Sequence, residues 1–163
     1  LVEGWVNLRA GPNPCIKLYD VALRDGWRIS EGLSGERGRW FSPEFDDSRW
    51  QEGRVKDAVN GGEIVWLRRG FHYEHRDDAI SPLMLRVASL GTKCKIYLNG
   101  ELIGRYMRIG PQRDFYMPEP FLKEENCIAI AVENYGEGRD PEAPSIKILQ
   151  YYVAKKLTIE LCL

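Results

Sequence analysis

The stretch KIYLNGELIGRYMRIGPQRDFYMPEPFLKEENCIAIAVEN, residues 95–134, decides the fold of this chain. It contains Asn99-Gly100 between two apolar segments. Both residues tolerate the positive φ angles of a type I′ turn, so the pattern predicts a β-hairpin over residues 93–106. Gly104 predicts a bulge or a close backbone approach where the second strand leaves the hairpin. The centre of the chain is therefore expected to be antiparallel β-structure.

The segment that follows, residues 126–135, alternates strictly between its two faces. Ile128, Ile130 and Val132 occupy one face, which is typical of a strand that covers a core. Small residues, Ala129 and Ala131, occupy the other face. This second face is small enough for a further layer of side chains to pack on it.

Further strands are expected on both sides of this stretch. Period-two patterns and turn residues predict strands at 63–73, at 82–90 and at 145–161, the last being one long strand or two shorter ones. Residues 1–60 are less regular and predict one or two strands, around 15–23 and 26–29, followed by a long loop over the sandwich. Helical periodicity of useful length is missing. The order predicts an all-β sandwich or barrel, with a mixed α+β fold as the alternative.

Length and charge fit one soluble globular domain. The chain has 163 residues, of which 44% are hydrophobic and 29% charged, and its formal net charge is −1. We therefore expect a single domain over residues 1–163. The charge gives no reason to expect nucleic acid as a partner. No apolar run approaches the roughly 18 residues of a membrane helix, so no membrane partner is expected either.

The four cysteines, Cys15, Cys94, Cys127 and Cys162, are far apart and show no CxxC spacing. A zinc site is therefore not expected. Cys94 is in phase with Ile96 and Leu98 and is predicted to be a buried apolar side chain. Buried free thiols are favoured, with a disulfide as the alternative.

Three segments together resemble a known domain family. WFSPEFDDSRWQEGRV (40–55), VWLRRGFHY (65–73) and the whole of 95–134 resemble the galactose-binding-like jelly-roll domains of β-galactosidases. The third segment, with its Asn-Gly, Gly-Arg-Tyr, Gly-Pro-Gln, Tyr-x-Pro and Glu-Asn order, resembles the C-terminal region of family 35 glycoside hydrolases. The resemblance implies an all-β jelly-roll β-sandwich that is a fragment of a larger glycosidase.

The same resemblance implies that catalysis resides elsewhere in the parent chain. Such enzymes carry two catalytic glutamates on a (β/α)8 barrel of about 250 residues, for which this chain is too short. Glu44, Asp46 and Asp47 lie together in an expected loop, and Asp46 is predicted to be a turn residue beside a Phe45/Trp50 anchor pair. We expect no catalytic residue here. The parent is expected to be a β-galactosidase, with an exo-β-glucosaminidase as the alternative.

Metal and cofactor sites are not expected. His72 and His75 are three residues apart, which on an extended segment places their rings on opposite faces. We therefore predict a solvated strand end and no metal ligands. No cofactor is expected, although a structural calcium ion, which related jelly rolls sometimes hold, stays open as an alternative.

Two functions are favoured, with an unrelated β-sandwich adhesion or interaction domain as a third alternative. The first is an accessory domain that packs on the catalytic domain of the parent chain or forms a subunit contact, as in a homo-oligomer. The second is a carbohydrate-binding module for galactose-type or β-linked sugars, in which aromatic rings stack on the sugar and a few polar groups hold its hydroxyls. Its candidate residues lie in the loops 36–50, 105–116 and 133–142: Trp40, Arg105, Tyr106, Gln112, Arg113, Asn134 and Tyr135.

Overall fold

The computed structural model describes residues 5–10, 17–75, 82–135, 142–152 and 157–162, and it describes side chains within 21–75, 82–135 and 142–150. Nearly all regular structure in these residues is β-strand. The strands are β1 (Trp5–Ala10), β2 (Lys17–Ala22), β3 (Trp27–Glu31), β4 (Gln51–Gly53), β5 (Ile64–His72), β6 (Leu83–Ala88), β7 (Lys93–Leu98), β8 (Glu101–Met107), β9 (Asp114–Met117), β10 (Glu125–Glu133), β11 (Ser145–Tyr152) and β12 (Leu157–Cys162). The described residues also form one short helix, α1 (Val55–Val59), and two 3-10 turns (Leu33–Gly35 and Glu119–Phe121).

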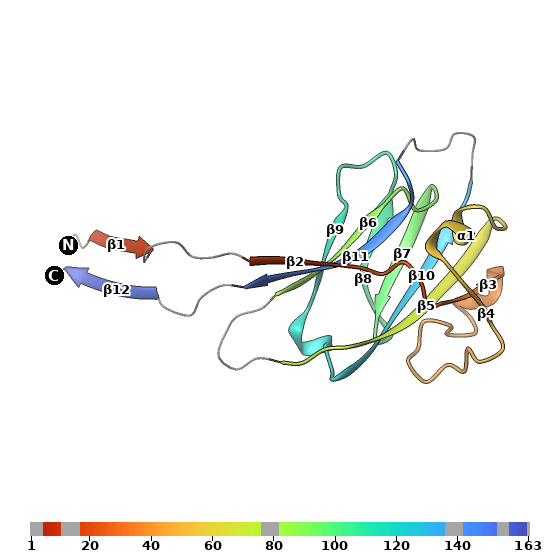
Figure 1. The fold of residues 1–163 in the computed structure, drawn as a ribbon, viewed down its shortest axis with the longest axis horizontal. Coiled ribbons are helices and arrows are strands. Elements are labelled where there is room, and N and C mark those ends of the chain that lie inside the picture. Colours follow the sequence, from red (N-terminus) through yellow and green to blue (C-terminus); the bar gives the residue numbers. More distant parts are fainter. Residues whose placement is uncertain (1–4, 11–16, 76–81, 136–141, 153–156, 163) are drawn as a thin grey trace.

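Two antiparallel sheets form a sandwich (Figure 1). The larger sheet has the order β4-β3-β5-β10-β7-β8, and the smaller has the order β2-β11-β6-β9. Strands that are distant in sequence are neighbours in both sheets, as when β5 lies between β3 and β10. The predicted all-β jelly-roll sandwich is thereby confirmed, and the α+β alternative is wrong.

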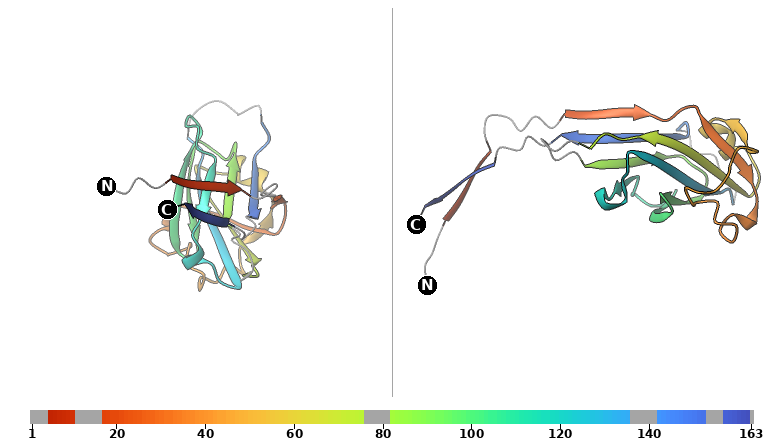
Figure 2. Two further views of the ribbon diagram at one scale, coloured as in Figure 1. Left: turned by 90° about the vertical axis from the view of Figure 1, so that its left-hand side faces the viewer. Right: turned by 90° about the horizontal axis from the view of Figure 1, so that it is seen from below.

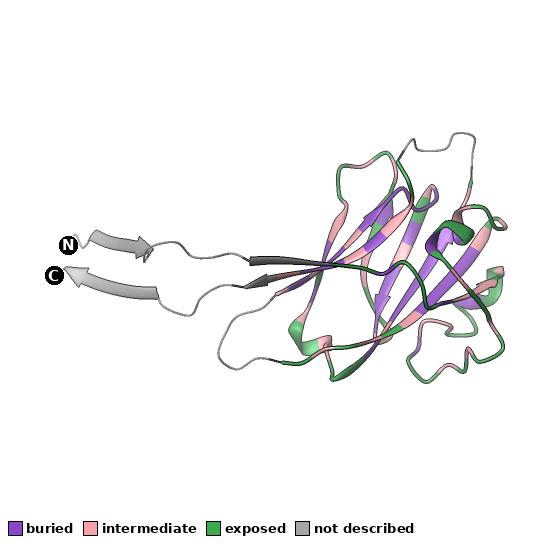
Figure 3. Ribbon diagram, viewed as in Figure 1, coloured by how far each residue is buried: buried purple, intermediate pink, exposed green. Residues whose placement is uncertain are grey.

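The core lies between the two sheets, where the buried residues are concentrated (Figure 3). The larger sheet supplies inward side chains from β5, β7 and β10, including the predicted Ile128, Ile130 and Val132. The smaller sheet supplies Leu85 and Val87 of β6 and neighbours on β9 and β11. Because successive side chains on a strand point to opposite faces, the remaining residues of β6, β9 and β11 face outward.

The central hairpin has the predicted turn. Asn99 has a φ of 50° and Gly100 a φ of 94°, so both residues of the turn lie in the left-handed region that a type I′ turn requires. The side chain of Asn99 also accepts a hydrogen bond from the amide of Cys127 at 2.8 Å, which ties the turn to β10.

A bulge interrupts the second strand of this hairpin. Ile96 lies opposite Gly104 but Tyr97 lies opposite Leu102, so Ile103 is the extra residue. A Cβ atom on Gly104 would come within 2.2 Å of the Phe115 ring. Gly104 therefore combines the two roles predicted for it, since it follows a bulge and allows β9 to approach closely.

A second, smaller layer covers the outer face of the larger sheet. Ala129 and Ala131 are buried there beside Trp66 and Tyr97, as predicted from their small size. The loop between β3 and β4 crosses this face and packs its aromatic residues on the layer. The predicted long loop over the sandwich is thus confirmed, and it closes a second hydrophobic cluster.

The strands β1 and β12 form a two-stranded antiparallel ribbon of their own. Trp5 lies opposite Cys162 and Ala10 opposite Leu157. The ribbon lies beyond the ends of β2 and β11 and apart from the sandwich (Figures 1 and 2). The predicted segment 145–161 is therefore two strands, and β1 was not predicted.

The thiols of Cys94 and Cys127 are free, and Cys94 is buried as predicted. Burial raises the pKa of both thiols, and that of Cys94 the more strongly. Cys15 and the side chain of Cys162 lie outside the described part of the chain. No helix of the described residues is long and apolar enough to cross a membrane.

Candidate functional site

The residues predicted to bind sugar do not form one site. Trp40 is half-buried and lies in the aromatic layer on the larger sheet, with its ring centroid 5.1 Å from that of Trp50 and 6.0 Å from that of Trp66. Tyr106 of β8 is buried in the core between the sheets. Their aromatic faces are therefore used by the fold, and Tyr106, which is only 1% exposed, has no surface on which a sugar could stack.

Asn134 also has a structural role. Its side-chain amide donates hydrogen bonds to the carbonyl oxygens of Ala58 at 2.8 Å and Gly62 at 3.0 Å. These bonds tie the end of β10 to helix α1 and to the turn before β5. Both N–H donors of this side chain are used within the fold and its oxygen, Oδ1, is buried, so neither group is open to a sugar hydroxyl.

Arg105 and Tyr135 remain at the surface but lie apart from the others. Arg105 is exposed on β8, opposite Lys95. Tyr135 is 41% exposed, and its backbone carbonyl accepts a hydrogen bond from the Thr92 hydroxyl. Neither residue lines the groove to which the remaining two candidates belong.

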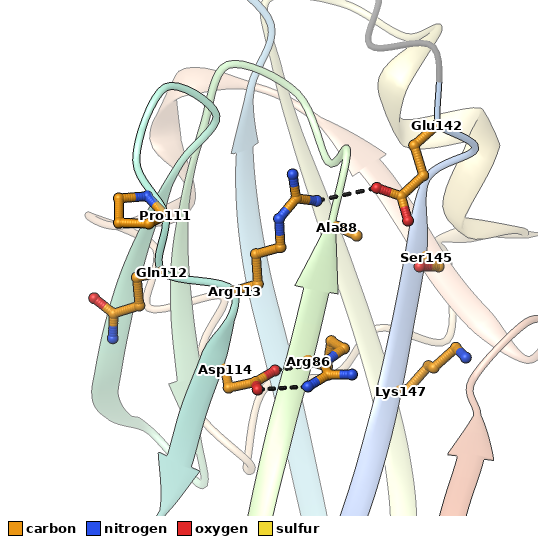
Figure 4. Close-up of a pocket in the computed structure, with 9 residues that line it drawn as sticks. All are labelled: Arg86, Ala88, Pro111, Gln112, Arg113, Asp114, Glu142, Ser145 and Lys147. Carbon is orange, nitrogen blue, oxygen red and sulfur yellow. Dashed lines mark hydrogen bonds and ion pairs between the residues drawn. The ribbon is translucent and has the colours of Figure 1, made fainter.

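Gln112 and Arg113 both line an open groove of about 700 Å³, and their side chains extend to opposite sides of the strand (Figure 4). The groove lies on the outer face of β9, β6 and β11, and the loop between β8 and β9 forms one side of it. Its lining residues are Arg86, Ala88, Pro111, Gln112, Arg113, Asp114, Glu142, Ser145 and Lys147. We refer to this site as the polar groove.

Two ion pairs order the cationic side chains of the polar groove (Figure 4). Arg86 donates from Nε and Nη2 to the two carboxylate oxygens of Asp114, at 2.6 and 2.7 Å. This bidentate pair holds the pKa of Asp114 below its usual value. Arg113 donates from Nη1 to Glu142 Oε2 at 3.1 Å. The groove thus presents three cationic and two anionic side chains, the third cation being Lys147.

Sequence reasoning missed Arg86, Asp114, Glu142, Ser145 and Lys147 as members of this groove. A partial signal existed, because Arg86 is the one charged residue among the apolar residues of the strand predicted at 82–90. Its partner Asp114 is 28 residues away and could not be named before the register of β6 and β9 was known.

The carboxylates Glu44, Asp46 and Asp47, in the loop between β3 and β4, each have a partner within the fold. Asp46 accepts a hydrogen bond from the backbone amide of Ser48 at 3.0 Å, and this bond lowers its pKa. The Ser42 hydroxyl lowers the pKa of Glu44 in the same way. Asp47 pairs with Arg68 at 2.8 Å. The predicted turn role of Asp46 is confirmed, and the Phe45 and Trp50 rings lie 5.5 Å apart beside it.

His72 lies at an exposed strand end, as predicted. Its Nδ1 lies 2.8 Å from Glu125 Oε1 across the sheet. The described residues hold no group of three or more His, Cys, Asp or Glu placed to bind a metal ion. The hydrogen bond that the ring donates to the Glu125 carboxylate raises the pKa of His72 above its usual 6.5.

This contact predicts a pH effect that NMR can measure. The His72 ring should titrate above 6.5, and Glu125→Gln should return the midpoint towards that value. Because the folded-state pKa is raised, the contact favours the folded state at pH below the unfolded pKa, and its contribution is lost as the pH rises through the folded pKa. Glu74→Gln is the control, since that carboxylate lies 3.8 Å away and should matter less. A midpoint that is the same in the wild type and in Glu125→Gln would refute the assignment.

Residues 64–126, which span β5 to the start of β10, match the family model described as the galactose-binding domain of β-galactosidase. The resemblance predicted from the sequence is confirmed. The matched part of this galactose-binding-like domain includes the central hairpin and most of the lining of the polar groove on β6 and β9.

Known proteins support the same relationship. Probable beta-galactosidase B of Penicillium rubens is 33% identical over 117 residues, which is 63% of this chain and 12% of that protein. Beta-galactosidase-1-like protein 3 of Mus musculus is 42% identical over 45 residues, 28% of this chain and 7% of that protein. The galactose-binding-like domain thus spans about an eighth or less of the length of these relatives.

Solved structures share the fold at lower identity. A beta-glucuronidase of Bacteroides uniformis is 19% identical with a TM-score of 0.61, and the match covers 82% of this chain and 18% of that one. A beta-glucuronidase from an uncultured Clostridium species is 20% identical with a TM-score of 0.58, covering 93% of this chain and 31% of that one. These likenesses confirm the sandwich fold of the galactose-binding-like domain.

Proposed function

We propose that residues 1–163 form a non-catalytic accessory β-sandwich domain of a β-galactosidase-like glycoside hydrolase, packed on its catalytic barrel or at a subunit interface. The observation that carries this proposal is the second aromatic layer. Trp66 and Tyr97 are buried on the outer face of the larger sheet, and Trp40, Phe41 and Trp50 cover them. Aromatic rings used in this way stabilise a rigid block and leave few platforms for sugar stacking.

The carboxylates of the loop support the non-catalytic part of the proposal. A glycosidase needs a general acid whose pKa is raised and a second carboxylate across the scissile bond. In this chain hydrogen bonds lower the pKa of Glu44 and Asp46, and Asp47 is paired with Arg68. These three carboxylates accept hydrogen bonds from donors within the fold. A general acid instead requires a carboxyl group that stays protonated.

An exposed apolar patch is the proposed contact with the parent. Ile109 is 89% exposed and Met107 is 46% exposed at the turn that ends β8. The amide of Arg108, between them, donates to the carbonyl oxygen of Thr92, whose hydroxyl in turn donates to the carbonyl of Tyr135. This network places the partly exposed Tyr135 at the same end of the larger sheet as the two apolar residues. We call Met107, Ile109 and Tyr135 the apolar patch.

The test uses the parent glycoside hydrolase with Ile109→Glu in this domain. A buried, unpaired charge at the contact should lower the thermal midpoint of the parent and its activity, while the isolated 163-residue chain melts unchanged. Leu33→Glu is the matched control, because Leu33 is 77% exposed on a different loop. The packing proposal fails if Ile109→Glu and Leu33→Glu leave the parent equally unaffected.

Carbohydrate binding is the second candidate, and the polar groove is the observation that favours it. It brings together Gln112 and Arg113, two of the residues predicted for sugar contact, in a hollow of the size that small ligands occupy.

A further inference from the structure

We propose that the polar groove binds a saccharide that carries a carboxylate or sulfate group, with Arg113 as the anchor of the anion. This inference rests on the second candidate function and adds to it the chemical class of the ligand.

The charges of the groove favour an anion. Three cationic side chains line it against two carboxylates. Asp114 is held by Arg86 in a two-bond fork, a geometry that fixes both side chains. Arg113 and Glu142, by contrast, are joined to each other by a single hydrogen bond of 3.1 Å, and the side chain of Glu142 is 59% exposed. The second pair is thus the weaker one and the one that a ligand can displace.

The anchor is well placed for such an exchange. Solvent-exposed ion pairs contribute little to the stability of a fold. Replacing the Glu142 carboxylate by a ligand carboxylate therefore costs little free energy of folding. A guanidinium also offers a planar fork that matches a carboxylate or a sulfate in two bonds. The side chain of Arg113 is 41% exposed, and Figure 4 shows it between the loop and β11, directed towards Glu142.

The rest of the lining suits a sugar ring better than a bare inorganic anion. Ser145 supplies a hydroxyl that can donate to and accept from ring hydroxyls, and the Gln112 amide adds a polar group at the edge of the groove. Pro111 and Ala88 supply short apolar surfaces. A volume of about 700 Å³ is far larger than one small anion, and the open shape admits a chain that continues into solvent.

The arrangement of the strands leaves this site accessible. β11 begins beside the groove, at Ser145, and ends at Tyr152, on the side from which the β1–β12 ribbon extends (Figure 1). The groove and the ribbon therefore lie at opposite ends of β11. A saccharide bound in the groove would not compete with the ribbon.

The experiment titrates the 163-residue chain with trigalacturonate, galactotriose and sodium sulfate while amide shifts are followed by NMR. We expect trigalacturonate to shift the amides of Arg86, Arg113 and Ser145, and the other two probes to have much weaker effects. Arg113→Gln should weaken the binding of trigalacturonate roughly tenfold, the usual effect of losing a hydrogen bond to a charged group. Glu142→Gln should strengthen it, because the competing carboxylate is removed. Arg105→Gln, an exposed arginine outside the groove, is the matched control and should have no effect.

The opposite signs expected for Arg113→Gln and Glu142→Gln separate binding from folding, since a variant that merely loosens the loop cannot strengthen binding. Gln112→Ala, at an exposed position, gives a second test if Arg113→Gln alters the fold. Equal shifts with sulfate and trigalacturonate would overturn the inference in favour of a simple anion site. Equal binding of galactotriose in the wild type and Arg113→Gln would overturn it in favour of a neutral-sugar module, and the second candidate function would survive. No shift with any probe at tens of millimolar would remove both, and the accessory role would stand.

Discussion

Replacing Arg68 by methionine is expected to lower the free energy of unfolding by about 3 kcal/mol, because it removes the cation of a largely buried ion pair. Arg68 is 3% exposed and extends from β5 through the aromatic layer. It donates from Nε to Asp47 at 2.8 Å and from Nη1 to the carbonyl of Ser42 at 2.9 Å, and it also bonds the carbonyls of Trp40 and Phe45. One side chain therefore fixes most of the loop between residues 40 and 47.

Without the guanidinium, the Asp47 carboxylate and the three loop carbonyls all lose their hydrogen-bond donor. Asp47 is 30% exposed and can be partly rehydrated, which is why the lower end of the usual 3–5 kcal/mol range is expected. For a chain of this size the loss corresponds to a fall in the thermal midpoint of roughly 6–12 °C. Thermal unfolding followed by circular dichroism measures it.

Two further variants test whether the hydrogen bonds of Arg68 are the cause of the expected loss of stability. Arg69→Met is the matched control, since Arg69 is the next residue of β5 and its side chain reaches the carbonyl of Asp25 at the surface. It should cost less than about 1 kcal/mol. Arg68→Lys should recover only part of the loss, because one ammonium group cannot reach the carboxylate and all three carbonyls. If Arg68→Met and Arg69→Met are equally stable, the loop is not held by this network.

The parts of the fold that follow from local chemistry could be predicted from the sequence. Asn99 and Gly100 carry their turn preference in their own backbone, so the hairpin needed no knowledge of its surroundings. The small side chains of Ala129 and Ala131 likewise predicted that another layer packs on them. In the structure that layer is formed by aromatic residues.

The candidate site depended on geometry that no local pattern contains. The bulge at Ile103 shows why, because Ile103 and Gly104 both approach the core and the alternation of β8 changes phase there. Tyr106 therefore points inward and Arg105 outward, the reverse of what continued alternation from Ile103 would give. Residue type suggested that both were ligand contacts, but only the register shows which of them is available. The polar groove has the same origin, since the pairing of β6 with β9 brings Arg86 and Asp114 together.

Trp66→Ala is expected to have the largest effect on stability, a loss of about 3–5 kcal/mol, which is the usual cost of deleting a buried tryptophan side chain. Trp66 is 1% exposed on the outer face of β5, with its ring centroid 6.0 Å from that of Trp40 and 6.1 Å from that of Tyr97. Gly35 lies so close to the indole that a Cβ atom there would come within 2.2 Å of it. The loop thus fits the ring tightly, and the space left by alanine cannot be refilled without moving the loop.

Urea unfolding followed by far-UV circular dichroism measures this loss without relying on tryptophan fluorescence. Trp50→Ala is the matched control, because Trp50 belongs to the same layer but is half-buried at its margin, and it should cost clearly less. The accompanying structural effect should be faster amide hydrogen exchange across residues 33–50 in Trp66→Ala than in the wild type. If Trp66→Ala costs no more than Trp50→Ala and the exchange of this loop is unchanged, the outer layer is not a second core. The aromatic residues of the loop would then be available as a sugar-binding surface, and the argument for a purely structural use of Trp40 would fail with it.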